Sequence, residues 1–190
     1  MRILGIDPGS LVTGYGVVER CGAEVRHVAH GTLRPPRAAT LGARLAAIHA
    51  GVREVIAAHQ PDRVVVEQVF VATNARAALV LGQARGVALA AASAAGLTVE
   101  ELSPQEVKRA VAGHGGAGKP QVQRMVQRLL TLRTAPARDA ADALAAAICR
   151  AHQGAFVELR PRRAARPREA SPRGGQAKSW GGRFVLRRAP

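Results

Sequence analysis

The first third of the chain is patterned as strands. An apolar run over 2–7 ends at Asp7, and two further apolar segments, 14–19 and 25–33, follow with glycine-rich punctuation between them. Short apolar runs bounded by turn residues are typical of strands. The pattern therefore predicts three strands joined by turns, arranged as an antiparallel meander.

From Thr40 the spacing of apolar residues becomes helical. They recur every three or four positions, at Leu41, Leu45, Ile48, Val52, Val55 and Ile56. This spacing gives one apolar helix face, and Pro61 stops the helix. The β-branched run 64–66 then predicts a short buried strand that ends at Glu67. A strand, a crossover helix and a strand imply a parallel pair.

The next segments are predicted to be helices around one more strand. The Ala- and Leu-rich stretch 74–95 predicts a long helix, and 97–102 predicts a strand. The sequence 103–106, Ser-Pro-Gln-Glu, has the form of a capping box that opens a helix ending near Val111. After a glycine-rich loop, the apolar spacing over 122–130 predicts an amphipathic helix.

The last helix is expected over 139–152, and the chain changes character after it. Residues 154–190 are rich in Arg, Pro, Gly and Ser, with almost no apolar periodicity, so burial cannot offset the entropy of ordering them. We expect an α/β domain over 1–153, with a five-stranded mixed sheet flanked by helices, and a disordered basic tail over 154–190. The length of 190 residues, 47% hydrophobic, suits one substantial core.

The net charge of +15 makes a polyanionic partner plausible, because each neutralised phosphate releases counterions. Residues 1–152 contain 18 basic and 11 acidic residues, whereas 153–190 contain 10 basic and two acidic ones. The tail therefore carries about half of the excess. However, 25 of the 28 cations are Arg, and an arginine-rich genome would also give this surplus, so charge alone does not decide the partner.

The sequence favours a cytoplasmic location. Cys21 and Cys149 lie far apart and form neither a disulfide framework nor a zinc-ligand spacing, which fits a reducing compartment. The opening apolar run meets Asp7 too early for a signal peptide, and no stretch is expected to reach membrane-spanning length.

Two carboxylates stand where a neutral residue would be usual. Asp7 and Glu67 end the most apolar predicted strands, where an unpaired charge is costly. Asp139 and Asp142 lie three apart on one face of the last helix, among alanines that leave room around them. Taken singly, a strand-end acid could reach water or pair with Arg, and an acid in a first helical turn could be a cap.

If the fold brings these four acids into one pocket, their repulsion would be relieved by a hard divalent cation with oxygen ligands. Mg²⁺ is the natural candidate, and Mn²⁺ would substitute for it. Such ions can activate a water molecule and stabilise the leaving oxygen of a phosphodiester. The hypothesis is therefore a metal-dependent nuclease.

Five blocks of sequence together resemble one family, the RuvC-type Holliday-junction resolvases, or crossover junction endodeoxyribonucleases. They span 1–152 in the family's order and spacing, and they are Gly5-Ile6-Asp7-Pro8-Gly9-Ser10, Thr13-Gly14-Tyr15-Gly16, Glu67-Gln68-Val69-Phe70, Leu81-Gly82-Gln83-Ala84-Arg85-Gly86 and Asp139-Ala140-Ala141-Asp142-Ala143-Leu144. The resemblance implies an RNase H-like fold. It also implies a homodimer that binds four-way DNA junctions and nicks two opposed strands symmetrically, in recombination and repair.

The resemblance further assigns roles to residues. Asp7, Glu67, Asp139 and Asp142 match the family's metal-binding catalytic acids. Phe70 matches an aromatic that stacks on or wedges against a base near the exchange point, although an aromatic here could equally be a core side chain. Lys108 and Lys119 match basic residues that meet the phosphates, although either could be a solvated surface charge. The branch-migration proteins RuvA and RuvB are implied as partners.

Two other classes of function remain as alternatives. A sugar-kinase or actin-like nucleotide binder also uses an Asp-Gly strand turn near phosphates, but it needs a second similar lobe that 190 residues cannot hold. A noncatalytic junction-binding scaffold would lack cleavage. The presence of all four acids argues against a scaffold, but presence is not geometry.

Overall fold

A computed structural model describes residues 1–68 and 75–158 of the chain, with the side chains of 154–158 left aside. Its sheet has five strands in the order β3-β2-β1-β4-β5. The strands are β1 (Arg2–Asp7), β2 (Thr13–Cys21), β3 (Glu24–Leu33), β4 (Arg63–Glu67) and β5 (Thr98–Leu102). The first three are antiparallel, and β1, β4 and β5 are parallel. The predicted five-stranded mixed sheet is confirmed.

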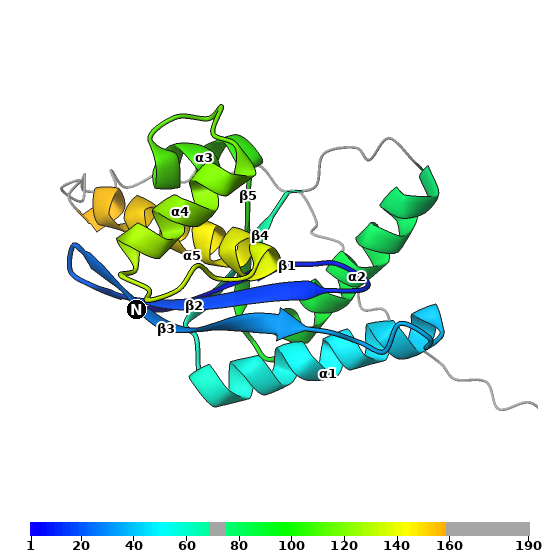
Figure 1. The fold of residues 1–190 in the computed structure, drawn as a ribbon. Helices are drawn as coiled ribbons and strands as arrows, with labels where there is room; N and C mark the ends of the chain where they lie inside the picture. The colour runs from blue at the N-terminus through cyan, green and yellow to red at the C-terminus, as the bar shows by residue number, and fades with distance from the viewer. Residues whose placement is uncertain (69–74, 159–190) are drawn as a thin grey trace, which may run out of the picture. The chain divides into compact units, whose positions relative to one another are not determined.

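Helices cover both faces of this sheet (Figure 1). They are α1 (Leu41–His59), α2 (Ala75–Ala94), α3 (Pro104–Ala112), α4 (Lys119–Leu129) and α5 (Arg138–Glu158). Helices α1 and α2 pack on one face, and α3, α4 and α5 pack on the other. The result is three layers, in which each face of the sheet has its own apolar core.

The side-chain alternation of a strand explains how β1 serves both cores. Leu4 and Ile6 are buried against α1 and α2, whereas Ile3 is buried on the α5 side. In β4, Val64 and Val66 face α1 and α2, and Val65 faces α5. Because successive side chains point to opposite faces, a strand covered on both sides is apolar throughout.

The predicted helix ends are confirmed where a cap was visible in the sequence. Ser103 Oγ accepts from the backbone N–H of Glu106, and the Glu106 carboxylate accepts from the backbone N–H of Ser103, at 2.9 Å. At the start of α1, Thr40 Oγ1 accepts from the backbone N–H of Ala43, a cap that the sequence analysis did not predict. These side chains satisfy backbone donors that the first helical turn leaves free.

Two predictions of the fold need correction. Strand β4 is parallel, as predicted, but its partner is β1 rather than β3, the strand directly before the crossover helix. Helix α5 continues to Glu158, six residues beyond the expected end, so the expected domain boundary after residue 153 falls within a helix. The predicted disorder over 159–190 lies outside the described residues.

A third correction concerns α2. By length and composition alone, this helix could cross a membrane, whereas no stretch of that length was expected. Its buried side chains, Ala84, Ala88, Ala91 and Ala92, belong to the core that α1 shares. Alanine lets α1 and α2 approach closely, so these four side chains have a packing role.

Candidate active site

The site begins with two strand ends. Asp7 ends β1 and Glu67 ends β4, and these neighbouring strands are parallel with Ile6 opposite Val66. The next residue of each strand is therefore an acid, at the same edge of the sheet. Both acids alternate onto the α5 face, because Ile6 and Val66 point to the opposite core.

Helix α5 supplies the other two acids because it lies unusually close to β1 and β2. A Cβ atom added at Gly5 or at Gly14 would stand 2.0 Å from a carbonyl oxygen of α5, that of Ala143 or of Asp139 respectively. Gly14 is also the cross-strand partner of Asp7. The backbone of Asp139 thus lies against Gly14, which is paired with Asp7. Asp142 follows within the same helix turn.

The four carboxylates interact electrostatically. Burial, followed by the charges of Asp142, Glu67 and Asp139, raises the pKa of Asp7 from 3.8 to about 7. Burial and the charge of Asp142 also raise the pKa of Glu67. The fold therefore brings four carboxylates together, and their negative charge is not fully neutralised by neighbouring side chains.

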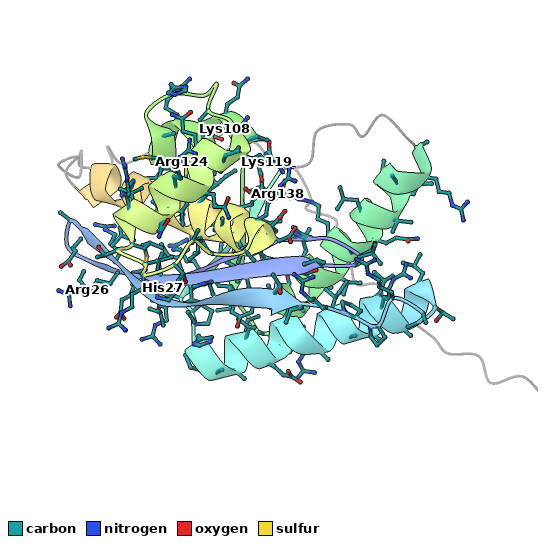
Figure 2. The ribbon with its side chains drawn as sticks, viewed as in Figure 1. Arg26, His27, Lys108, Lys119, Arg124 and Arg138 are labelled. Carbon is teal, nitrogen blue, oxygen red and sulfur yellow. The ribbon has the colours of Figure 1, made fainter. Side chains whose placement is uncertain are left out.

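Two lysines partly offset this charge. The Lys119 Nζ donates to Asp142 Oδ2 at 3.4 Å, and its charge lowers the pKa of both Asp7 and Glu67. Lys108, on α3, lowers the pKa of Glu67. Figure 2 shows both lysines on the side of the molecule formed by α3, α4 and the start of α5, together with Arg138. The structure thus places both predicted lysines beside the acids.

The donor set fits a hard cation. Within 1–68 and 75–158, the structure records no hydrogen bond or ion pair to the side chains of Asp7, Glu67 and Asp139. Among the same residues, no three metal-ligating side chains already converge closely enough to enclose an ion. Carboxylate oxygens are nonetheless the ligands that Mg²⁺ and Mn²⁺ prefer, and their mutual repulsion is what a divalent cation relieves.

The backbone around the acids is also fixed by side chains that the sequence analysis did not assign to the site. Thr13, fully buried, bridges the loop after Asp7, since its Oγ1 donates to the carbonyl of Gly9 at 2.9 Å and accepts from the Gly9 N–H at 3.3 Å. Arg85, on α2, donates to the carbonyl of Glu67 at 2.9 Å. Both residues lie in the blocks that carry the family resemblance, but no pattern in the sequence indicated which backbone groups they would contact. Phe70 lies outside the described residues.

Comparisons with known proteins identify the family of the chain. The sequence model of "Crossover junction endodeoxyribonuclease RuvC" matches residues 3–150. The RuvC of Halorhodospira halophila is 59% identical over 151 residues, covering 80% of this chain and 90% of that protein. The RuvC of Alkalilimnicola ehrlichii is 54% identical over 163 residues, covering 86% of this chain and 98% of that protein.

Solved structures give the same result. The Thermus thermophilus RuvC in complex with a Holliday junction substrate has a TM-score of 0.77 and 36% identity, and the match covers 83% of this chain and 96% of that one. The yeast mitochondrial Holliday junction resolvase Ydc2 shares the fold, with a TM-score of 0.62 and 13% identity. This match covers 82% of this chain and 81% of the Ydc2 chain. The expected RNase H-like fold is confirmed, and the chain belongs to the RuvC family of crossover junction endodeoxyribonucleases.

Proposed function

We propose that this protein resolves four-way DNA junctions, in recombination and repair, by metal-dependent hydrolysis of phosphodiesters in two opposed strands. The observation that carries the proposal is the set of four acids on one edge of the sheet, with the pKa of Asp7 raised to about 7. A buried carboxylate cluster is costly to keep for stability alone. Relatives named for this activity support the junction as substrate.

The four acids would hold Mg²⁺, or Mn²⁺ in its place. When bound, the metal supplies an activated water and stabilises charge on the leaving oxygen. The chain's own contribution is to hold four carboxylate groups on rigid elements, two strand ends and one helix turn. Because the pKa of Asp7 is raised to about 7, this ligand must lose a proton to bind a cation near neutral pH.

The basic residues beside the acids would bind the DNA backbone. Lys119 is 58% exposed, so its ammonium group can reach a phosphate while it stays near Asp142. Lys108 lies near Glu67, from the neighbouring helix. A compact ammonium group suits a phosphate close to a metal centre. Phe70, three residues after Glu67, is proposed to stack on or wedge against a base.

Two opposed nicks require two sites, and we propose that a homodimer provides them. A two-fold axis would present the same site to two symmetry-related strands. RuvA and RuvB are proposed as further partners, from the family alone.

The proposed location is the cytoplasm. Cys21 and Cys149 are both free, and the surface Cys21 is compatible with a reducing compartment. The buried alanines of α2 belong to the protein core, so α2 is assigned to packing within the domain.

The first test is a strand-cleavage assay on a synthetic four-way junction and on a linear duplex of matched sequence, with Mg²⁺, Mn²⁺ or a chelator. The proposal predicts paired, symmetrical nicks that appear only on the junction and only with metal. Junction binding without any cut would instead indicate a scaffold. Equal cutting of the duplex would indicate a general nuclease.

A further inference from the structure

We propose that Arg85 is a positioning residue for Glu67, and that it sets the affinity of the four-acid site for divalent metal. This inference rests on the proposed function, because it takes Glu67 to be a metal ligand. Arg85 comes from α2, on the opposite face of the sheet from α5, and it does not belong to the cluster of acids and lysines described above. It therefore acts on the site through the backbone.

Two contacts hold the Arg85 guanidinium group. One nitrogen, Nη1, donates to the backbone carbonyl of Glu67 at 2.9 Å, and the other, Nη2, lies 2.7 Å from Oε1 of Glu101. The Arg85 side chain is 14% exposed, and that of Glu101 is 45% exposed. A planar guanidinium offers donors in a fixed fork, so one side chain ties the end of β4 to β5.

The backbone at Glu67 needs such a tether. The paired register of β1 and β4 ends at Ile6 and Val66, one residue before the acids. On the other side, the N–H of Gln68 still bonds to the carbonyl of Leu102 at 2.7 Å. The carbonyl of Glu67 accepts from Arg85 instead. Because a strand-end side chain follows the orientation of its own peptide, this bond sets where the Glu67 carboxylate points.

We infer that Arg85 acts on the site through its hydrogen bond and not through its charge. Its positive charge is matched by Glu101, and the cations that lower the pKa of Glu67 are Lys119 and Lys108. When a residue that hydrogen-bonds to a metal ligand, without contacting the metal, is removed, metal affinity or activity commonly changes by about 10–100-fold. A change of position, rather than of charge, is thus the effect to measure.

The test is a titration of the DNA-free protein with Mn²⁺, following free Mn²⁺ by electron paramagnetic resonance, on wild type and Arg85→Lys. Lysine keeps the charge but cannot reach both acceptors from one nitrogen in the same geometry. We expect about tenfold weaker Mn²⁺ binding. In the cleavage assay, half-saturating Mn²⁺ should rise by the same factor, and excess Mn²⁺ should restore most of the rate.

The matched control is Arg150→Lys. Arg150 is 15% exposed and its Nε donates to Glu100 of β5 at 2.5 Å, so it is an equally buried arginine paired with a β5 glutamate. It has no recorded contact with any of the four acids in the described parts of the chain. This variant should lose stability comparably but bind Mn²⁺ as wild type does. Equal Mn²⁺ affinities for the Arg85 and Arg150 variants would overturn the inference.

A milder pair of variants covers the case in which Arg85→Lys does not fold. Glu101→Ala removes the acceptor of Arg85 Nη2, so it should weaken Mn²⁺ binding, by less than Arg85→Lys does, whereas Glu100→Ala should leave Mn²⁺ binding unchanged. If Glu101→Ala also leaves Mn²⁺ binding unchanged, the positioning role is wrong. If wild type itself binds no Mn²⁺, the proposed metal mechanism fails, and that result is distinct from a wild type that binds and variants that do not differ.

Discussion

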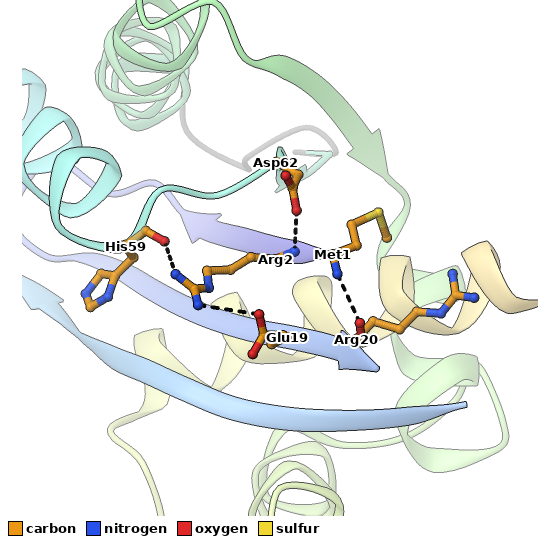
Figure 3. A network of polar contacts seen from close by, with 6 residues as sticks. All are labelled: Met1, Arg2, Glu19, Arg20, His59 and Asp62. Atoms are coloured by element: carbon orange, nitrogen blue, oxygen red, sulfur yellow. Dashed lines mark hydrogen bonds and ion pairs between the residues drawn. The ribbon is translucent and has the colours of Figure 1, made fainter. Parts of the chain in front are cut away.

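The acidic side chains at the start of β1 and those at its end differ in how they are paired. These two ends lie at opposite edges of the sheet. At the edge where β1 begins, Arg2 donates its backbone N–H to Asp62 at 2.6 Å and its guanidinium to Glu19 at 3.4 Å and to the carbonyl of His59 at 2.7 Å (Figure 3). At the edge where β1 ends, burial and mutual repulsion raise the pKa of Asp7 and Glu67. The first edge is internally compensated, and the second is not.

The contrast separates charges that hold the fold from charges kept for a ligand. A partly exposed ion pair contributes modestly to stability, and its loss is tolerated. A buried carboxylate near three others costs stability unless something binds it. At one edge the guanidinium of Arg2 pairs with Glu19, whereas at the other edge Lys119 bonds only to Asp142 among the four acids.

The largest expected effect comes from removing one acid of the uncompensated edge. Asp7→Asn should reduce metal-dependent junction cleavage at least about a thousandfold, because metal-based charge stabilisation contributes several kcal/mol to the barrier. Junction binding without metal should survive. The measurement is single-turnover cleavage beside a binding titration on the same junction.

The matched control is Asp62→Asn at the compensated edge, where the amide oxygen of Asn can still accept from the N–H of Arg2. This variant should cleave at close to the wild-type rate. Undiminished cleavage by Asp7→Asn would remove the metal mechanism, and equal losses in both variants would remove the distinction between the edges.

The next effect concerns how α5 is held against the sheet. Gly14→Ala would put a Cβ atom 2.0 Å from the carbonyl oxygen of Asp139, so the start of α5 must move. Overpacking of this kind lowers the free energy of unfolding by about 1–3 kcal/mol, and a shift of about 1 Å at reacting groups costs about a hundredfold in rate. Urea denaturation and the cleavage assay would measure the two effects.

Gly42→Ala is the control for this change. Gly42 lies in α1 with nothing within 4 Å of an added Cβ atom, so alanine should raise stability by about 0.5–1 kcal/mol, because glycine is the poorer helix former. If Gly14→Ala cleaved at the wild-type rate, the contact between α5 and β2 would not set the position of the helix acids.

The sequence predicted much of this fold because local signals were strong. A capping box at Ser103, a proline after α1 and continuous β-branched runs each depend on neighbouring residues. The pairing of β4 with β1 had no such signal, because strand order depends on which sheet faces the helices cover. Helix α5 continues through Gly154, a residue type that often ends a helical pattern, and it ends at Glu158, three residues before Pro161.

The residues of the site were partly predictable because local sequence signals mark them too. Asp7 and Glu67 were visible because a charge ends an apolar run, and Asp139 with Asp142 because two acids share a helix face. Their meeting depends on Gly5 and Gly14, which let α5 approach β1 and β2 across more than a hundred residues of sequence. Arg85 was one of 25 arginines, and its link to Glu67 became visible through its contact with the Glu67 carbonyl.

A smaller effect follows from the raised pKa of Asp7. The folded pKa of about 7 exceeds the ordinary value of 3.8, so the folded state binds the extra proton between these values. Stability from this group is complete below about pH 3.8 and is lost as the pH rises to about 7, by up to about 4 kcal/mol. Urea denaturation with chelator should show a larger loss in wild type than in Asp7→Asn, in which the raised pKa of Glu67 still contributes. Parallel pH dependence of the two proteins would contradict the shift.

The smallest expected effect tests the one lysine recorded in an ion pair with the acids. Lys119 is 58% exposed, so solvent screens its charge, but it lowers the pKa of Asp7 and Glu67. Lys119→Met should therefore move the pH of half-maximal cleavage upward, by less than about one pH unit, when measured at saturating junction and fixed Mg²⁺. Lys119→Arg keeps the charge and should keep the profile. An unshifted profile in Lys119→Met, with weaker junction binding alone, would assign Lys119 to phosphate contact and leave Lys108 as the cation that acts on Glu67.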